Sequence, residues 1–143
     1  MVVIRSAPLR DLDAVTAYEI ARLRQDVFVV EQACVYPDLD GRDLEPGAVQ
    51  VWAEDGVGVV ACLRVLREPG GGVRIGRVAT ARGARGEGVA TALVSTALEE
   101  APRPVVLDAQ SHLEGWYSRR GFVRDGAEFV EDGIPHVPMR LAR

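Results

Sequence analysis

The chain has 143 residues, of which 48% are hydrophobic and 27% charged, and its net charge is −4. This length and composition fit one folded domain with a sizeable core and exclude a disordered chain. The negative net charge argues against a nucleic-acid-binding face, and the longest apolar runs are too short to cross a bilayer. We therefore expect a single domain over residues 1–143 with neither a nucleic-acid nor a membrane partner.

The cysteines and histidines argue against a metal framework. Cys34 and Cys62 do not form a Cys-x-x-Cys pair, and the chain has only two histidines. These numbers leave no zinc site, so we expect no metal. Residues 1–6 lack the charged and apolar pattern of a secretory signal. We therefore expect reduced thiols and a cytoplasmic location.

The first half of the chain predicts a strand, a helical region and a hairpin. A short apolar strand is expected at 2–4, and Asp11 or Asp13 can cap the helical region that follows. Residues 35–47 predict a loop, and Asp55-Gly56 predicts a hairpin turn between strands at 49–53 and 57–66. Apolar residues in the helical region suit one long helix or two shorter ones: Val15, Tyr18, Leu23, Val27 and Val30.

The second half alternates strands and helices. Helices are predicted at 88–100 and at 113–120, where Gly121 ends the second. The nearly all-apolar segment 105–109 is typical of a strand that helices cover on both faces. Two strands are expected within 122–141, joined at Asp132-Gly133.

The strand that begins at Val73 contains a slip in its alternation. Apolar side chains stand at Val73 and Ile75 and then at Val78, which changes from odd to even positions. One extra residue in a strand turns its faces over. We therefore expect a β-bulge near Gly76-Arg77.

A glycine-rich turn, Arg85-Gly-Glu-Gly-Val-Ala90, joins this strand to the next helix. Such a turn directs backbone N–H groups to one place, where the helix N-terminus adds partial positive charge, so it suits a phosphate or pyrophosphate. A P-loop is excluded because Val89-Ala90 replace the required Lys-Ser or Lys-Thr. A dinucleotide loop is excluded because Thr91 replaces the third glycine.

The Arg-x-x-Gly-x-Ala pattern of this turn resembles the pyrophosphate loop of the GCN5-related N-acetyltransferases (GNATs), which bind acetyl-coenzyme A (acetyl-CoA). The order of predicted elements is similar to that family over essentially the whole chain. The resemblance implies an α/β (α+β) fold with a mixed, mostly antiparallel sheet, a splayed parallel strand pair and flanking helices. It implies that the cofactor contacts Val78, Ala79, Thr80, Arg85, Gly86, Glu87, Gly88, Val89, Ala90, Thr91, Gln110 and Tyr117.

A second segment, residues 115–122, resembles the family's Tyr-x-x-x-Gly-Phe signature. The resemblance implies that Tyr117 lies beside the cofactor sulfur, where a phenol can protonate the leaving thiolate. Alternatively, Tyr117 is a packing residue with Trp116 and Phe122. A backbone N–H of the splayed strand, at Val78, is expected to hold the oxyanion. Gln110 stands where many family members carry Asn.

Residues 23–32, 36–41 and 131–139 together resemble the ElaA-like branch of this superfamily. The branch implies an acceptor side formed by Arg24, Phe28, Glu31, Asp40 and His136. An Arg-x-x-x-Phe element at residues 24–28, with the acidic loop, also resembles acyl-homoserine lactone synthases, but this chain lacks their usual tryptophan.

The general base is left open by the sequence. Many relatives place a Glu on the splayed strand, whereas this chain has none at 73–80. Glu31 and His136 are our candidates, and an imidazole has a suitable pKa. A water chain would also serve. The other candidates are Asp40, Asp43, Asp108 and His112.

We therefore expect an enzyme that transfers acetyl from acetyl-CoA to a primary amine of a small molecule or a peptide. The acidic segment 38–45 either suits a cationic acceptor or is a solvated loop. The alternatives are a non-catalytic acyl-CoA sensor, in which Tyr117 is dispensable, and a protein-interaction domain. The chain is expected to be a monomer or a homodimer, with exposed strands near the C-terminus available for pairing.

Overall fold

The computed structural model describes all 143 residues, which form a central sheet covered by helices on both faces. The strands are β1 (Val3–Ala7), β2 (Val49–Glu54), β3 (Val59–Arg67), β4 (Val73–Thr80), β5 (Val105–Gln110), β6 (Val123–Arg124), β7 (Phe129–Glu131) and β8 (Ile134–Leu141). Their order across the sheet is β1-β2-β3-β4-β5-β8-β6, and β7 also pairs with β8.

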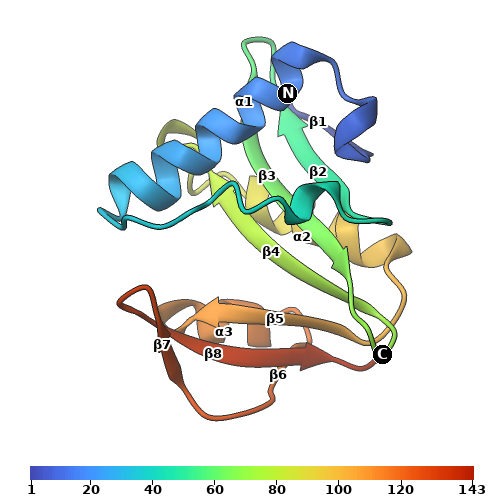
Figure 1. The fold of residues 1–143 in the computed structure, drawn as a ribbon, viewed down its shortest axis with the longest axis vertical. Coiled ribbons are helices and arrows are strands. Elements are labelled where there is room, and N and C mark those ends of the chain that lie inside the picture. Colours follow the sequence, from blue (N-terminus) through green and yellow to red (C-terminus); the bar gives the residue numbers. More distant parts are fainter.

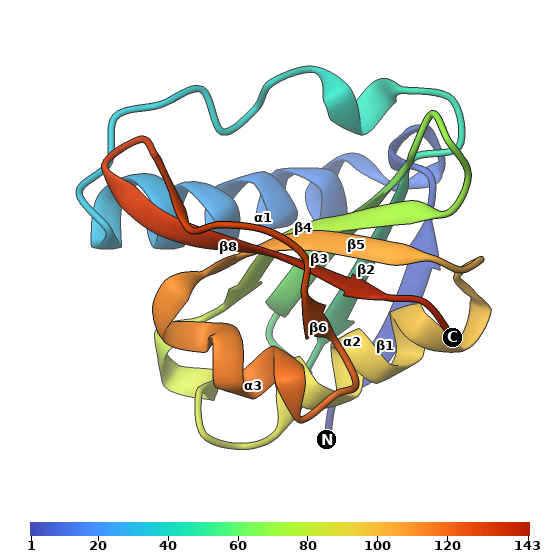
Figure 2. The same ribbon diagram turned by 90° about the horizontal axis from the view of Figure 1, so that it is seen from below.

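The helices are α1 (Ala14–Arg24), α2 (Val89–Glu100) and α3 (Glu114–Ser118), and a π-helical segment, η2 (Gln25–Glu31), continues α1. Short 3₁₀ turns are η1 (Leu9–Asp11), η3 (Arg42–Leu44), η4 (Arg82–Ala84) and η5 (Ser111–Leu113). Helix α1 and the loop after it cover one face of the sheet, and α2 and α3 cover the other (Figures 1 and 2). No helix is long and apolar enough to span a membrane.

The helical region at the N-terminus is one continuous stretch with two geometries. Asp13 caps α1 by accepting a hydrogen bond of 2.7 Å from the backbone N–H of Thr16, whereas Asp11 lies in η1. In η2 the backbone bonds span five residues, as from Gln32 N–H to the Val27 carbonyl. This wider helix places its last turns against β4.

The expected β-bulge in β4 is confirmed. Cys62 of β3 pairs with Ala79, and Arg64 pairs with Gly76. Between these two pairs β4 has one residue more than β3. Arg77 lies in the interval with a φ of 55°, in the left-handed region. The bulge turns over the faces of β4 and explains the slip in its apolar pattern.

The fold class is also confirmed, because the sheet contains one parallel pair and that pair diverges. Strands β4 and β5 pair only at Val73 with Val105 and at Arg74 with Val106. Beyond these pairs the two strands separate, which is visible as the widening gap between them in Figure 1. All the other strand pairs are antiparallel.

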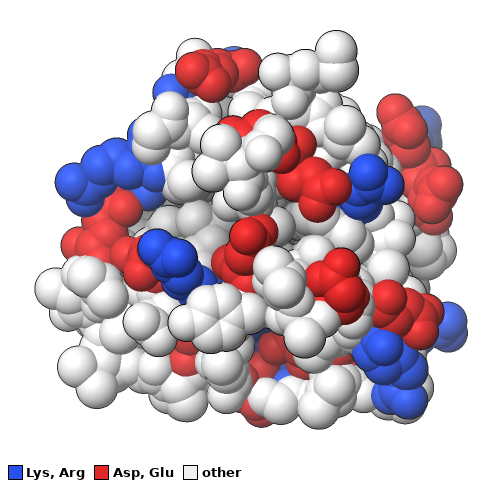
Figure 3. Space-filling view, turned by 90° about the horizontal axis from the view of Figure 1, so that it is seen from above, with Lys and Arg blue, Asp and Glu red and all other residues white.

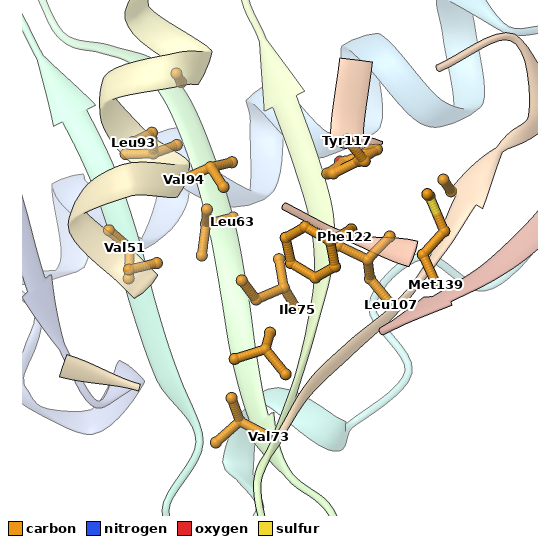
Figure 4. Close-up of a cluster of buried hydrophobic side chains, with 14 of the residues drawn as sticks. Val51, Leu63, Val73, Ile75, Leu93, Val94, Leu107, Tyr117, Phe122 and Met139 are labelled. Atoms are coloured by element: carbon orange, nitrogen blue, oxygen red, sulfur yellow. The ribbon is translucent and has the colours of Figure 1, made fainter. Parts of the chain in front are cut away.

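The main core lies between the sheet and helices α2 and α3, and it joins the two halves of the divided sheet. Leu93 and Val94 of α2 and Val105 of β5 are fully buried in it. The rings of Tyr117 and Phe122 pack edge to face with centroids 5.9 Å apart beside β5 (Figure 4). A second cluster lies under α1 and η2 and includes Ile20, Leu23, Phe28, Trp52 and Cys62.

The C-terminal third differs from the expectation in two places. Helix α3 ends at Ser118 rather than at 120, because the chain turns tightly toward Gly121, whose φ is 95°. Residues 122–141 form three strands rather than two. The additional strand, β6, has two residues and pairs with Arg140 and Met139, which is too short for an alternating pattern to reveal.

On the face seen from above in Figure 1, acidic and basic side chains are interspersed with uncharged ones (Figure 3). All 17 basic residues of the chain are arginines.

Candidate active site

The separation of β4 from β5 opens a cleft of about 970 Å³. Its walls come from η2, the loop after it, β4, β5, α3 and β8. The predicted site residues that line it are Phe28, Glu31, Asp40, Val78, Ala79, Thr80, Arg85, Gly86, Ala90, Gln110, Tyr117 and His136. A smaller cavity of about 480 Å³ lies near the C-terminal end of α2, away from these groups.

Five predicted residues do not line the cleft: Glu87, Gly88, Val89, Thr91 and Arg24. The first four belong to the glycine-rich turn and the first turn of α2, beside the mouth of the cleft. Arg24 lies elsewhere, because its side chain is buried against Asp38 and Asp43 and only 2% of the residue is exposed.

The glycine-rich turn presents free backbone donors. Gly86 and Gly88 have φ of 80° and 79°, and no heavy atom stands within 4 Å of a Cβ built on either. Gly88 is the N-cap of α2 and supplies no side chain, so the first N–H groups of the helix have no capping partner. The first turn of α2 contains no acidic residue. An open, uncapped and electropositive helix end fits a pyrophosphate.

Arg85 connects this turn to η2 through Glu31. Its guanidinium donates hydrogen bonds of 2.6 and 2.7 Å to the two carboxylate oxygens of Glu31, and its Nε donates to the Thr80 carbonyl. The hydrogen bonds from Arg85 lower the pKa of Glu31. Glu31 is therefore an ionised partner of Arg85 and a weak proton acceptor.

The bulge leaves two residues of β4 without a directly opposed residue on β3. Neither Arg77 nor Val78 has a partner residue on β3, and the pairing of β4 with β5 stops at Arg74. Val78 lines the cleft. Val78 therefore lies where β4 and β5 have separated.

Tyr117 is a buried side chain that still reaches the cleft. Only 6% of the residue is exposed, and its hydroxyl forms no hydrogen bond within the chain. Burial raises the pKa of Tyr117 to about 12, because an apolar environment disfavours the phenolate. The phenol is thus held in its protonated form.

Arg120 contacts the helix that carries Tyr117, a role that no sequence motif indicated. It lies 3.5 Å from the ring centroid of Trp116 and donates a hydrogen bond of 2.6 Å to Oγ1 of Thr91. These contacts tie α3 to the first turn of α2. They connect the helix that carries the phenol to the residue that follows the glycine-rich turn.

His136 enters the cleft from β8. Its Nδ1 lies 2.7 Å from the carbonyl oxygen of Ile134, and its ring stacks on Phe129 with centroids 5.7 Å apart. Because a carbonyl only accepts, Nδ1 carries a proton in this contact, so the lone pair of the uncharged tautomer is on Nε2. The amide of Gln110, on the facing strand β5, donates to Gln32 at 3.3 Å.

The acidic loop after η2 is neutralised by arginines. Asp38 and Asp43 pair with Arg24 at 3.0 and 2.7 Å, and Asp40 pairs with Arg64 at 2.8 Å. Burial opposes ionisation of Asp40 and Asp43, yet hydrogen bonds from Arg64 and Arg24, respectively, hold both pKa values below their usual range. These carboxylates therefore do not form a free anionic patch, which removes the acidic segment as an argument for a cationic acceptor.

Comparison with known proteins identifies the family. A family model described as "Acetyltransferase (GNAT) domain" matches residues 23–143. The chain belongs to the GNAT family. It is 50% identical over 141 residues to the UPF0039 protein Rv2851c of Mycobacterium tuberculosis (strain H37Rv), which covers 95% of this chain and 90% of that protein.

The ElaA-like resemblance is confirmed as well. The chain is 39% identical to the protein ElaA of Escherichia coli K12 over 141 residues, covering 90% of this chain and 89% of ElaA. The crystal structure of E. coli ElaA matches with a TM-score of 0.90 at 34% identity, over 99% of each chain.

A crystal structure of an acyl-CoA N-acyltransferase from Pseudomonas aeruginosa matches with a TM-score of 0.92 at 36% identity, over 99% of this chain and 100% of that one. GNAT enzymes use acetyl-CoA as their cosubstrate. The chain is therefore an acyltransferase, and the cleft is its candidate active site.

The raised pKa of Tyr117 makes a prediction for an ultraviolet titration of phenolate absorbance. An unperturbed tyrosine ionises near pH 10, whereas Tyr117 is expected to ionise near pH 12. Wild type and Tyr117→Phe should thus give the same titration through pH 10 and differ only at higher pH. A difference of one tyrosine already at about pH 10 would contradict the burial of this phenol.

Proposed function

We propose that this GNAT transfers an acetyl group from acetyl-CoA to a primary amine of a small molecule or a peptide, by direct attack of the amine on the thioester. One observation carries the proposal. The uncapped N-terminus of α2, the bulge of β4 at Val78 and the phenol of Tyr117 all border one cleft. A pyrophosphate, a thioester carbonyl and a leaving sulfur need these three groups in this order.

The glycine-rich turn binds the pyrophosphate in this proposal. The backbone N–H groups from Gly86 through Ala90 donate to its oxygens, and the dipole of α2 adds favourable charge. The side chain of Arg85 is already held by Glu31 and Thr80, so the backbone carries the contact. The pantetheine arm then extends between β4 and β5, where the sheet is open.

At the reacting carbonyl, Val78 and Tyr117 have different roles. The N–H of Val78 donates to the oxyanion of the tetrahedral intermediate. When the C–S bond breaks, the electron pair goes to sulfur, and Tyr117 gives the thiolate its proton. The raised pKa of Tyr117 keeps that proton in place at neutral pH.

His136 is the base that we assign to the acceptor side. Its Nε2 lone pair is free, whereas the carboxylate of Glu31 is paired with Arg85 and has a lowered pKa. The imidazole takes one proton from the attacking amine. Phe28 and Asp40 line the same side of the cleft and bound the space that is left for the acceptor.

Tyr117→Phe tests the general acid. We expect kcat to fall by about 100-fold or more, because the variant has no proton for the thiolate, while the Kd of acetyl-CoA stays unchanged. The assay follows thiol release over a panel of primary amines. Because the chain has no lysine, its own side chains supply no competing amine.

Tyr18→Phe is the matched control, since Tyr18 is 68% exposed on α1 and should retain full turnover. Full turnover by Tyr117→Phe would remove the general-acid role. Binding of acetyl-CoA with no acetyl transfer to any amine by the wild type would instead indicate a sensor.

Gly88→Asp tests the pyrophosphate site by calorimetric titration with acetyl-CoA. A carboxylate at the N-terminus of α2 repels pyrophosphate, and we expect Kd to rise roughly tenfold. Gly88→Asn is the control, because asparagine has the same shape, carries no charge and tolerates positive φ. Equal affinity in the two variants would show that the turn does not hold the pyrophosphate.

His136→Asn and Glu31→Gln test the base against each other. We expect His136→Asn to lower kcat/KM by about 100-fold at neutral pH. The loss should shrink as the pH rises, because more of the acceptor amine is then already deprotonated. A larger loss in Glu31→Gln, with the same recovery at high pH, would transfer the role to Glu31.

A further inference from the structure

Arg77 occupies a backbone conformation that its residue type does not favour. Its φ is 55°, in the middle of β4, directly after Gly76. A glycine would adopt this angle without strain, whereas a side chain opposes it. Strained residues of this kind persist where surrounding contacts fix them, and they concentrate at functional sites. The contacts of the Arg77 side chain are therefore the relevant observation.

The guanidinium of Arg77 contacts the loop that follows η2. Its Nε lies 2.9 Å from Oδ1 of Asp38, and its Nη2 donates to the Asp38 carbonyl at 3.2 Å and to Oδ2 of Asp40 at 3.3 Å. The group also lies 5.4 Å from the ring centroid of Tyr36, whose hydroxyl donates to Asp38 at 2.9 Å. Three residues of one loop thus hold a single residue of β4.

That loop is itself anchored. Arg24 of α1 binds the other carboxylate oxygen of Asp38, and Arg64 of β3 forms two hydrogen bonds with Asp40. Arg24 and Arg64 are almost fully buried. The loop is therefore anchored by residues other than Arg77, and the contacts of Arg77 tie the bulge of β4 to this loop.

We propose that Arg77 is a positioning residue, which holds the bulge of β4 in the orientation that turns the N–H of Val78 into the cleft. It does not touch the reacting atoms. The proposal rests on the function proposed above, because the orientation of Val78 matters only where a carbonyl accepts from it. A displacement of about 1 Å in such a donor lowers turnover by as much as about 100-fold.

The variant Arg77→Gly separates the side chain from the backbone angle. Glycine adopts the same φ without strain, so the protein should fold, while the tether to Asp38 and Asp40 is gone. We expect kcat to fall about 10- to 100-fold with the Kd of acetyl-CoA unchanged. The kcat of Arg77→Lys should lie between those of Arg77→Gly and the wild type, because a lysine cannot reproduce the planar, multiple contact of arginine.

Arg5→Gly is the control for loss of a strand arginine. Arg5 lies on β1, outside the cleft, and pairs with Glu54 at 2.6 Å. We expect its kcat to equal that of the wild type. Wild-type kcat in Arg77→Gly overturns the proposal. If Arg77→Gly does not fold, wild-type kcat in Arg77→Lys overturns it in the same way.

A readout without turnover keeps this test separate from the proposed function. In an NMR titration, acetyl-CoA should shift the Val78 amide of the wild type more than coenzyme A does, because only the thioester has a carbonyl there. Arg77→Gly should bind with the same Kd and lose that difference. A retained difference overturns the role of Arg77. A wild type that does not bind acetyl-CoA overturns the proposed function instead.

Discussion

The early end of pairing between β4 and β5 is the constraint on which the remaining structure depends. A parallel pair that continued past Arg74 would satisfy the backbone of both strands and would leave no cleft. The bulge opposite β3 redirects β4 after Gly76, so the strands part while β4 keeps its antiparallel partner. The core beneath α2 and α3 spans the parting and supplies the apolar contacts that hold the two half-sheets at a fixed separation.

The wall opposite the phenol is built from paired charges. Three arginines and three aspartates meet between α1, β3, β4 and the loop after η2: Arg24, Arg64, Arg77, Asp38, Asp40 and Asp43. Removing Arg24 or Arg64, which are buried in this cluster, leaves uncompensated charge, which is strongly destabilising. The cluster therefore fixes the position of a loop that has little regular secondary structure of its own. The three positive and three negative charges balance, so the cluster shapes the cleft without adding net charge to it.

Much of this architecture was predictable from the sequence, because it follows local rules. The odd-to-even change of apolar residues at Val78 revealed the bulge, and the spacing of Gly86 and Gly88 predicted the open turn before α2. The partners of Arg24 could not be predicted, because Asp38 and Asp43 lie 14 and 19 residues away along the chain. The resemblance to the ElaA-like branch therefore predicted Arg24 at the acceptor side, whereas the fold buries its side chain. The pairing of Glu31 with Arg85 was hidden for the same reason, since 54 residues separate them.

The geometry of two walls of the cleft depends on the exact number of residues in each. Both η2, with its five-residue hydrogen-bond spacing, and the bulge of β4 contain one residue more than the regular element requires. Deleting a single residue from η2 would restore an ordinary α-helix and change how its last turn meets β4. Deleting one from the bulge would restore a flat ladder. Single-residue gaps at these two places are thus changes of active-site geometry, even where every named side chain is retained.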